Sequence, residues 1–246
     1  MVRINICTCS LQKDTNGYQN VVTKNSGNPF DCTILFTKPY RRFKQIALKN
    51  AQIPIGFYNI RAPMNTVTIN TITYTVPIGN YTLATLITAL NTAVGAGVGV
   101  FAQTTAPVDN RLKFTPVSGA TFSVSTTVNT LGGLLGFTDG QVTTGTTALT
   151  ATNAFLFPFD TYVNIYMKDI GTSSPEVSQS TFKIPLNVST GNILWKENSE
   201  NSQIIQVTDC SSRVDRLSVQ VLDQFGNILN NNGIDWSFTL EIDCDP

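Results

Sequence analysis

The chain has 246 residues, which is enough for one large domain or two small ones. Hydrophobic residues make up 41% of it, charged residues only 13%, and the formal net charge is +0. The balanced charge excludes a global attraction for nucleic acid or for an anionic membrane. The polar surface must therefore consist mainly of Thr, Ser, Asn and Gln, which suits β-structure and close packing into a larger assembly.

The sequence contains no histidine, which removes the commonest general base and the commonest neutral metal ligand. The segment Leu131–Phe137 is rich in glycine, but it lacks the lysine and the strand–helix context of a phosphate loop. Several carboxylates lie among turns and strand ends, where they usually form caps and turns: Asp160, Asp169, Asp209, Asp215, Asp223, Asp235, Asp243 and Asp245. We therefore predict no catalytic, cofactor-binding or metal-binding residues, leave any binding residues unassigned, and do not expect an enzyme.

The cysteines are Cys7, Cys9, Cys32, Cys210 and Cys244. The segment after Met1 has no apolar signal region, and no apolar run approaches the ~20 residues that span a membrane. An odd, widely spaced set of cysteines without a secretion signal favours reduced thiols. Cys7 and Cys9 could form half of a metal site, but no second pair stands at a suitable spacing, so we assign no metal there.

Residues 1–30 are mixed in character and predict an N-terminal arm that includes a short strand from Arg3 to Cys9. Asn16-Gly17 and the segment Asn25–Pro29 are turn-forming. A segment this polar gains little by packing on its own domain. It is therefore either a tail that crosses the surface or an arm that is exchanged with a neighbouring subunit.

Alternating apolar residues from Cys32 to Thr37 predict the first strand of the main domain, and a second strand is expected over residues 43–53, ending at Pro54. Between them we expect a basic loop from Lys38 to Lys44. Four cationic residues beside two aromatic ones could contact nucleic acid or an acidic partner. A solvated turn is the simpler interpretation.

Residues 66–153 predict a small inserted α+β domain. Apolar residues recur at the spacing of one helix face: Leu83, Leu86, Ile87, Leu90 and Val94. Asn80 or Thr82 can cap the start of this helix, and Gly95 can end it. Short strands are expected over residues 67–70, 72–76, 98–103, 111–116 and 121–126.

From residue 155 onward the pattern is again that of strands alone, expected at 162–167, 181–188, 204–208, 217–222 and 234–242. The last two alternate strictly between apolar and polar residues, and they predict a pair of strands within one antiparallel sheet. The predicted fold class is therefore mainly β: a single jelly-roll β-sandwich, formed by residues 31–65 and 154–246, interrupted by the insertion at 66–153. Alternation alone does not separate a jelly roll from other Greek-key sandwiches.

Ordered stretches of the chain resemble one protein family: Ala51–Ile60, Ile78–Asn91, Arg111–Thr115, Thr130–Phe137, Asp215–Asn227 and Asp235–Ile242. They are similar to the vertex-type minor capsid proteins, or pentons, of virophages, polinton-like viruses and related double-stranded DNA viruses. The stretches occur in the same order as in the family, and they frame most of residues 45–242. The first 30 residues carry no such resemblance.

The resemblance implies a structural protein of the virion, assembled inside the host cell: an upright jelly roll that forms homopentamers at the fivefold vertices of an icosahedral capsid. Its partners would be itself and a double-jelly-roll major capsid protein, with the outward insertion as the candidate for contact with a host receptor. No specific nucleic acid, membrane span, cofactor or catalytic residue is implied.

Two alternatives remain open at this point. One is another minor capsid role, as a cement or spike-base protein. The other is a carbohydrate-binding or receptor-binding β-sandwich, which would present a row of exposed aromatic residues. Trp236 and Phe238 alternate like core residues, so only the cluster Phe155–Phe159 is left unassigned.

Overall fold

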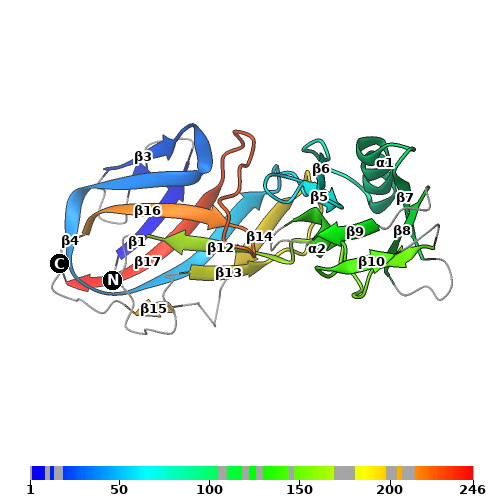
Figure 1. The fold of residues 1–246 in the computed structure, drawn as a ribbon. Helices are drawn as coiled ribbons and strands as arrows, with labels where there is room; N and C mark the ends of the chain where they lie inside the picture. The colour runs from blue at the N-terminus through cyan, green and yellow to red at the C-terminus, as the bar shows by residue number, and fades with distance from the viewer. Residues whose placement is uncertain are drawn as a thin grey trace. The chain divides into compact units, whose positions relative to one another are not determined.

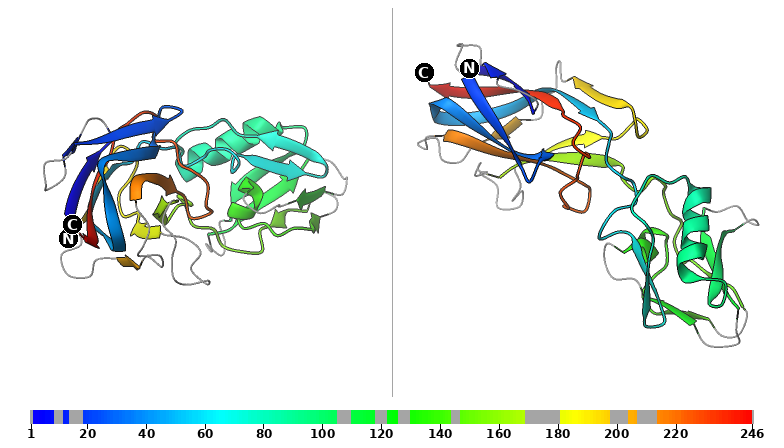
Figure 2. Two further views of the ribbon diagram at one scale, coloured as in Figure 1. Left: turned by 90° about the vertical axis from the view of Figure 1, so that its left-hand side faces the viewer. Right: turned by 90° about the horizontal axis from the view of Figure 1, so that it is seen from above.

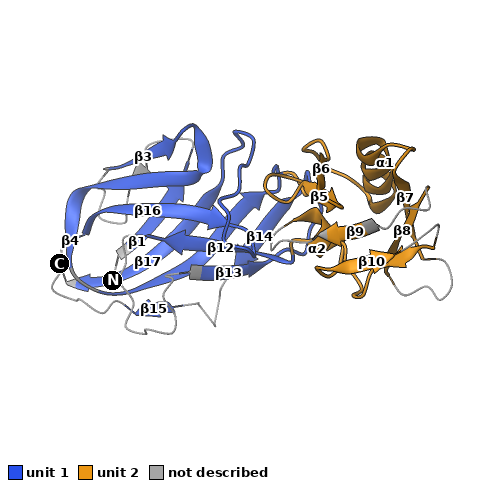
Figure 3. Ribbon diagram, in the orientation of Figure 1, with its two compact units in different colours: residues 1–57, 161–246 blue, residues 58–160 orange. Residues whose placement is uncertain are grey.

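The computed structural model (Figure 1) describes residues 2–8, 12–13, 19–104, 110–117, 122–125, 130–143, 147–168, 181–197, 204–206 and 214–245. The chain forms two compact units (Figure 3): unit 1 contains Met1–Phe57 and Thr161–Pro246, and unit 2 contains Tyr58–Asp160. The sequence placed the inserted domain at 66–153. The compact unit takes in additional residues on both sides, because their side chains pack on its core.

Unit 1 contains two antiparallel sheets. Sheet I has the order β1-β17-β4-β14, and β15 also pairs with β4. Sheet II has the order β3-β4-β16-β12-β13, and β2 pairs with β3. The strands are β1 (Val2–Cys7), β2 (Gln12–Lys13), β3 (Gln19–Asn25), β4 (Asn28–Pro54), β12 (Tyr162–Met167), β13 (Thr181–Pro185), β14 (Ile193–Glu197), β15 (Ile204–Gln206), β16 (Val214–Leu222) and β17 (Ser237–Asp245).

Strand β4 belongs to both sheets, because its 27 residues pass from sheet II into sheet I without a break. Tyr40 pairs with Val214 of sheet II, and Arg41 pairs with Asp245 of sheet I. The prediction of a basic loop from Lys38 to Lys44 is therefore wrong. This segment is the bend of a continuous strand. The buried ring of Tyr40 packs edge-on against Phe36, 4.9 Å between ring centroids, which holds the bend against the core.

The strand order is that of a jelly roll. Apart from the β12–β13 connection and the short link from β14 to β15, each successive connection from β4 onward carries the chain from one sheet to the other. The two sheets face each other as layers (Figure 2), and apolar residues from both form one core. Its largest fully buried side chains include Phe30, Ile34, Ile46, Phe182 and Phe238. The predicted fold class, a mainly β jelly-roll sandwich with a small α+β insertion, is confirmed.

The sequence predicts that the last two strands pair within one sheet. This is wrong, because they do not pair with each other. β16 lies between β4 and β12 in sheet II, whereas β17 lies between β1 and β4 in sheet I. Alternation of apolar and polar residues is the same whichever sheet a strand enters, so it could not reveal this separation.

The described residues among 1–30 pack on unit 1 and do not form the separate arm expected from the sequence. β1 pairs along its whole length with β17, and β3 pairs with β4. Ile4 and Ile6 of β1 are 0% and 2% exposed in the core of unit 1. The apolar residues of this segment are few, but they alternate, and this buries them on one face of sheet I.

Unit 2 has its own core, formed by two small sheets and a helix. The sheets have the orders β10-β9-β5-β6 and β11-β8-β7. The elements are β5 (Thr66–Ile69), β6 (Ile72–Thr75), α1 (Leu83–Val94), β7 (Gly99–Gln103), β8 (Leu112–Pro116), β9 (Phe122–Ser125), α2 (Leu131–Leu134), β10 (Gln141–Thr143) and β11 (Leu149–Thr150).

Helix α1 begins and ends as the sequence predicts. Thr82 is the N-cap and forms a capping box with Thr85, and the N–H of Gly95 bonds to the carbonyl of Asn91. The Asn91 side chain also accepts from the Phe101 N–H at 2.6 Å and donates to the Phe101 carbonyl at 3.1 Å, which ties the helix to strand β7. No helix in the described part of the chain has the length and apolarity needed to cross a membrane.

Candidate functional site

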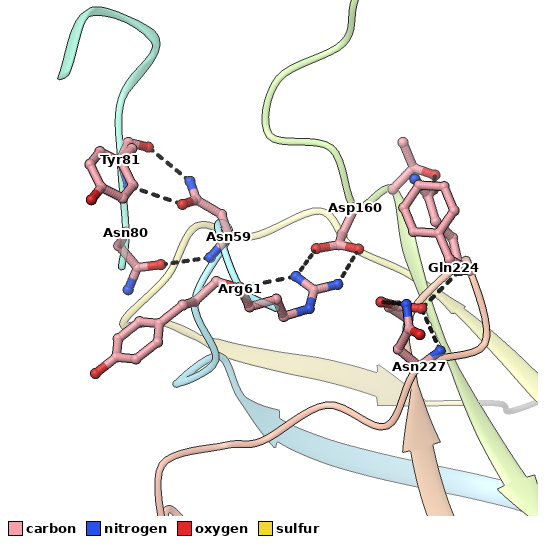
Figure 4. Close-up of polar contacts among 11 residues, drawn as sticks. Asn59, Arg61, Asn80, Tyr81, Asp160, Gln224 and Asn227 are labelled. Atoms are coloured by element: carbon pink, nitrogen blue, oxygen red, sulfur yellow. Dashed lines mark hydrogen bonds and ion pairs between the residues drawn. The ribbon is translucent and has the colours of Figure 1, made fainter. Parts of the chain in front are cut away.

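The two chain ends of unit 2 are joined by a buried ion pair between Arg61 and Asp160 (Figure 4). Arg61 Nη1 donates to Asp160 Oδ2 at 2.7 Å, and Nη2 donates to Oδ1 at 2.9 Å. The side chains are only 10% and 4% exposed. Nη1 also donates to the Tyr58 carbonyl at 3.0 Å. This bidentate geometry engages both carboxylate oxygens, so Asp160 acts as a structural residue rather than as an acid or base.

Asn59 connects the start of unit 2 to the loop before α1 (Figure 4). Its side chain accepts from the Tyr81 N–H at 2.9 Å and donates to the Tyr81 carbonyl at 2.8 Å. Its own N–H donates to Asn80 Oδ1 at 3.0 Å. The side-chain amide thus makes the two hydrogen bonds that a neighbouring strand would make.

Asp223 of unit 1 is fully buried and organises the turn after β16. Its Oδ1 accepts from the backbone N–H groups of Phe225 and Asn227, each at 2.8 Å, and its Oδ2 accepts from Asn227 Nδ2 at 3.1 Å. In the same turn Gln224 Oε1 accepts from the Thr161 hydroxyl at 3.0 Å. The Asp223–Asn227 stretch, which carries part of the family resemblance, therefore has a structural explanation.

Two carboxylates on the outside of unit 1 form ion pairs with basic side chains. Glu241 contacts Arg3 and Lys49, each at 3.1 Å. Asp235 contacts Lys24 and accepts from the Thr8 hydroxyl at 2.8 Å. Partial burial raises the pKa of both carboxyls, but the hydrogen bonds and charges of these partners outweigh it, and each pKa lies below its ordinary value.

Of the remaining candidate carboxylates, the described ones lie on strands of unit 1. Asp215 lies on β16, and Asp243 and Asp245 lie on β17. Asp169 and Asp209 lie outside the described residues. Within the described ranges, no three His, Cys, Asp or Glu residues come together in a group that could hold a metal ion.

The described cysteines differ in whether they form a disulfide bond. Cys32 and Cys244 are buried and are not disulfide-bonded, and burial, with the negative charge of Asp31, raises the pKa of the Cys32 thiol to about 12. Cys7 is disulfide-bonded, which corrects the expectation of reduced thiols for that residue. Cys9 and Cys210 lie outside the described residues. A buried thiol with so high a pKa is not a nucleophile at neutral pH.

The aromatic residues whose burial the structure describes do not form an exposed row. Trp236 and Phe238 are 2% and 1% exposed and stack with ring centroids 4.4 Å apart, which confirms that they are core residues. Phe155 and Phe157 pack against the core of unit 2. Among the described aromatic residues, Tyr58 of unit 2 and Trp195 of unit 1 are exposed.

Exposed apolar side chains gather along one edge of sheet I. Ile193 and Trp195 are each 58% exposed, and Ile204 is 51% exposed. The basic side chains of Lys38, Arg41 and Lys44 are also exposed at the bend of β4. No sequence pattern distinguishes Trp195 from a buried residue. For the Arg61–Asp160 pair a signal existed, since both residues flank a long segment that is poor in charge.

These features define a class of fold rather than a catalytic centre: a single jelly roll with an α+β insertion between β4 and β12. No protein-family model matches the chain, and no curated protein matches it. Among solved structures the chain is similar to the mavirus penton protein, with 10% sequence identity and a TM-score of 0.45. The match covers 93% of this chain and 99% of that one.

Proposed function

We propose that this chain is a structural capsid protein, a penton that forms homopentamers at the fivefold vertices of an icosahedral virion. The observation that carries the proposal is the position of the insertion within the jelly roll. Unit 2 leaves the sandwich after β4 and returns before β12. This is the arrangement that the ordered sequence resemblance implies, and it does not depend on any single motif.

The composition and the polar groups of the structure support a role based on contact rather than on chemistry. The described carboxylates Asp160, Asp223, Asp235 and Glu241 are engaged by their own neighbours in the chain. A surface with little charge favours packing between copies. In this proposal the partners are other copies of the chain and a double-jelly-roll major capsid protein, and unit 2 is the candidate for contact with a host receptor.

The mass of the assembly tests this proposal. The purified full chain is measured by native mass spectrometry and by sedimentation over a concentration series, alone and after co-expression with the major capsid protein of the same virus. We expect a species of five chains. A chain that stays monomeric or trimeric at high concentration under both conditions would contradict the proposal.

A capsid reconstruction separates the penton from the other minor capsid roles. Density for this chain on the fivefold axes is the expected result. Density between capsomers would instead identify a cement protein, and the penton proposal would fail.

A further inference from the structure

The free edge of sheet I carries an exposed apolar surface. β14 and β15 both pair with β4 on one side, and no described strand pairs with them on the other. Ile193, Trp195 and Ile204 are exposed there, and we call these three residues the apolar edge. Exposed apolar residues are ordinary when they are scattered, but three along one unpaired edge indicate a contact surface.

The register shows that the three side chains lie on the outer face of the sheet. Leu194 and Ile205 belong to the core of unit 1, so their neighbours along the strands point away from it. Ile193 pairs with Pro54, and Ile204 pairs with Ala47 further along the same strand. The three residues of the apolar edge therefore lie beside β4, on the outer face of the sheet.

The opposite edge of the same sheet, β1, has a complementary charge. Arg3 lies on β1, and its guanidinium contacts the carboxylate of Glu241, which Lys49 also contacts. The Arg3 side chain is 60% exposed. On the apolar edge the exposed charge beside Trp195 is that of Glu197.

The pairing across sheet I shows which residues of β1 lie level with which residues of the apolar edge. Arg3 pairs with Glu241, Glu241 pairs with Ala47, and Ala47 pairs with Ile204. One row of the sheet thus begins at Arg3 and ends at the apolar edge.

The next row on the same face ends at Glu197. It runs from Asn5 through Thr239 and Asn50 to Glu197. A copy placed beside the sheet without a shift along the strands brings Arg3 close to Ile204 and Glu197.

The strand directions also fit a repeating contact. Each neighbouring pair in the order β1-β17-β4-β14 is antiparallel, so β14 and β1 run in opposite directions. A rotation about an axis along the strands preserves these directions. The β1 of a second copy then lies antiparallel to β14 of the first, as every other pair in the sheet does.

We propose that the apolar edge of one copy docks against the β1 edge of a second copy of this chain. The inference rests on the proposed penton function, because a closed ring requires two different surfaces on each subunit. The aliphatic stem of Arg3 covers Ile204 and its guanidinium lies near Glu197, whereas Trp195, in the row that begins at Cys7, and then Ile193 extend the apolar contact toward the end of β1.

A matched pair of variants tests the contact. Ile193 and Ile72 are equally exposed, at 58%, but Ile72 lies on β6 of unit 2. Ile193→Thr and Trp195→Ser should each raise the dissociation constant of the assembly, by roughly thirtyfold for the tryptophan. Ile72→Thr should leave it unchanged. All three side chains are exposed, so we expect the circular dichroism and the melting curve of the dissociated chain, measured at low concentration, to stay the same.

Tryptophan fluorescence gives a second measurement on the unmodified chain. The sequence has only 2 tryptophans, and Trp236 is buried in the core. Quenching by acrylamide therefore reports mainly on Trp195, and it should fall as the chain assembles. Quenching that is the same in monomer and assembly would overturn the inference.

The outcomes distinguish this inference from the proposed function. If the unmodified chain forms pentamers and the variants Ile193→Thr and Trp195→Ser form them equally well, the inference is wrong and the penton function stands. If these variants form pentamers but no longer bind the major capsid protein, the apolar edge is the binding site for that protein and the inference is again wrong. If the unmodified chain never assembles, both fail.

Discussion

At the scale of single residues, the ion pair between Arg61 and Asp160 is the contact with the largest predicted effect. Asp160→Asn leaves a buried guanidinium without its counter-charge, which costs about 3–5 kcal/mol. We expect urea to unfold unit 2 at a clearly lower concentration in this variant. Thr71→Ala, at an exposed position of the same unit, serves as the control and should change stability by about 0.5 kcal/mol or less. Equal unfolding curves for the two variants would contradict a structural role for the pair.

Glu241 predicts part of the acid sensitivity of unit 1. Its folded-state pKa lies below the ordinary 4.5, because the hydrogen bonds and charges of Lys49 and Arg3 outweigh the opposing effect of burial. The folded state therefore binds fewer protons than the unfolded state. The stability from this group is present above pH 4.5 and is lost as the pH falls through the lowered pKa.

Glu241→Gln removes that contribution. Urea midpoints measured between about pH 6 and pH 2 should fall less steeply for the variant than for the unmodified chain. The variant should be the less stable of the two at neutral pH. Parallel curves over the whole range would show that Glu241 does not contribute.

The roles of individual residues were only partly predictable. Trp236 and Phe238 could be assigned to the core because their neighbours alternate with them. Asp223 could be expected to form a turn, but its full burial could not, because burial depends on which segments cover it. Trp195 lies among apolar neighbours in the sequence, and only the register with β4 shows that its side chain points outward.

At the scale of elements, β1 is predicted to be essential to the sandwich rather than dispensable. Ile4 and Ile6 are buried between the sheets, and replacing either with Ala should cost about 2–5 kcal/mol. Chemical denaturation of Ile4→Ala and Ile6→Ala measures this directly. The exposed neighbour Asn5 provides the control, because Asn5→Ala removes little more than its hydrogen bond with Thr239. A loss below about 1 kcal/mol for both isoleucine variants would mean that the segment is a loosely attached arm.

The helix and most strands could be predicted from periodicity, and the misses have physical reasons. Helix α1 carries its signal locally, in one apolar face and a Thr cap. β3 was missed because it is largely polar and shows no clear apolar alternation. β14 was missed because its outer face carries Ile193 and Trp195, so it shows no alternation. Pairing between strands far apart in the sequence, such as β1 with β17, leaves no local signal.

At the scale of the whole molecule, unit 2 is predicted to fold by itself. Residues 58–160 are contiguous, enclose a separate core, and have their two ends joined by the Arg61–Asp160 pair. The excised segment should give a dispersed NMR spectrum and a single cooperative urea transition. The same segment carrying Asp160→Asn should unfold at a lower urea concentration. A collapsed spectrum for the unmodified segment would show that the core of unit 2 depends on the sandwich.

The fold class and the presence of an insertion could be predicted from the sequence, because both depend on broad patterns. The boundaries of the insertion could not, because residues 58–65 and 154–160 are irregular, and tertiary contacts decide which core they join. The subunit contact was also beyond prediction, since it requires knowing which strand edges are left unpaired.

The continuity of β4 has a consequence for how the protein is made. This strand is synthesised before the inserted unit, whereas its partners β16 and β17 are synthesised after it. Neither layer of the sandwich can close before then, and the apolar residues of β4 stay exposed during translation. The inserted unit is contiguous, so it can complete its own core while the strands that close the sandwich are still being synthesised.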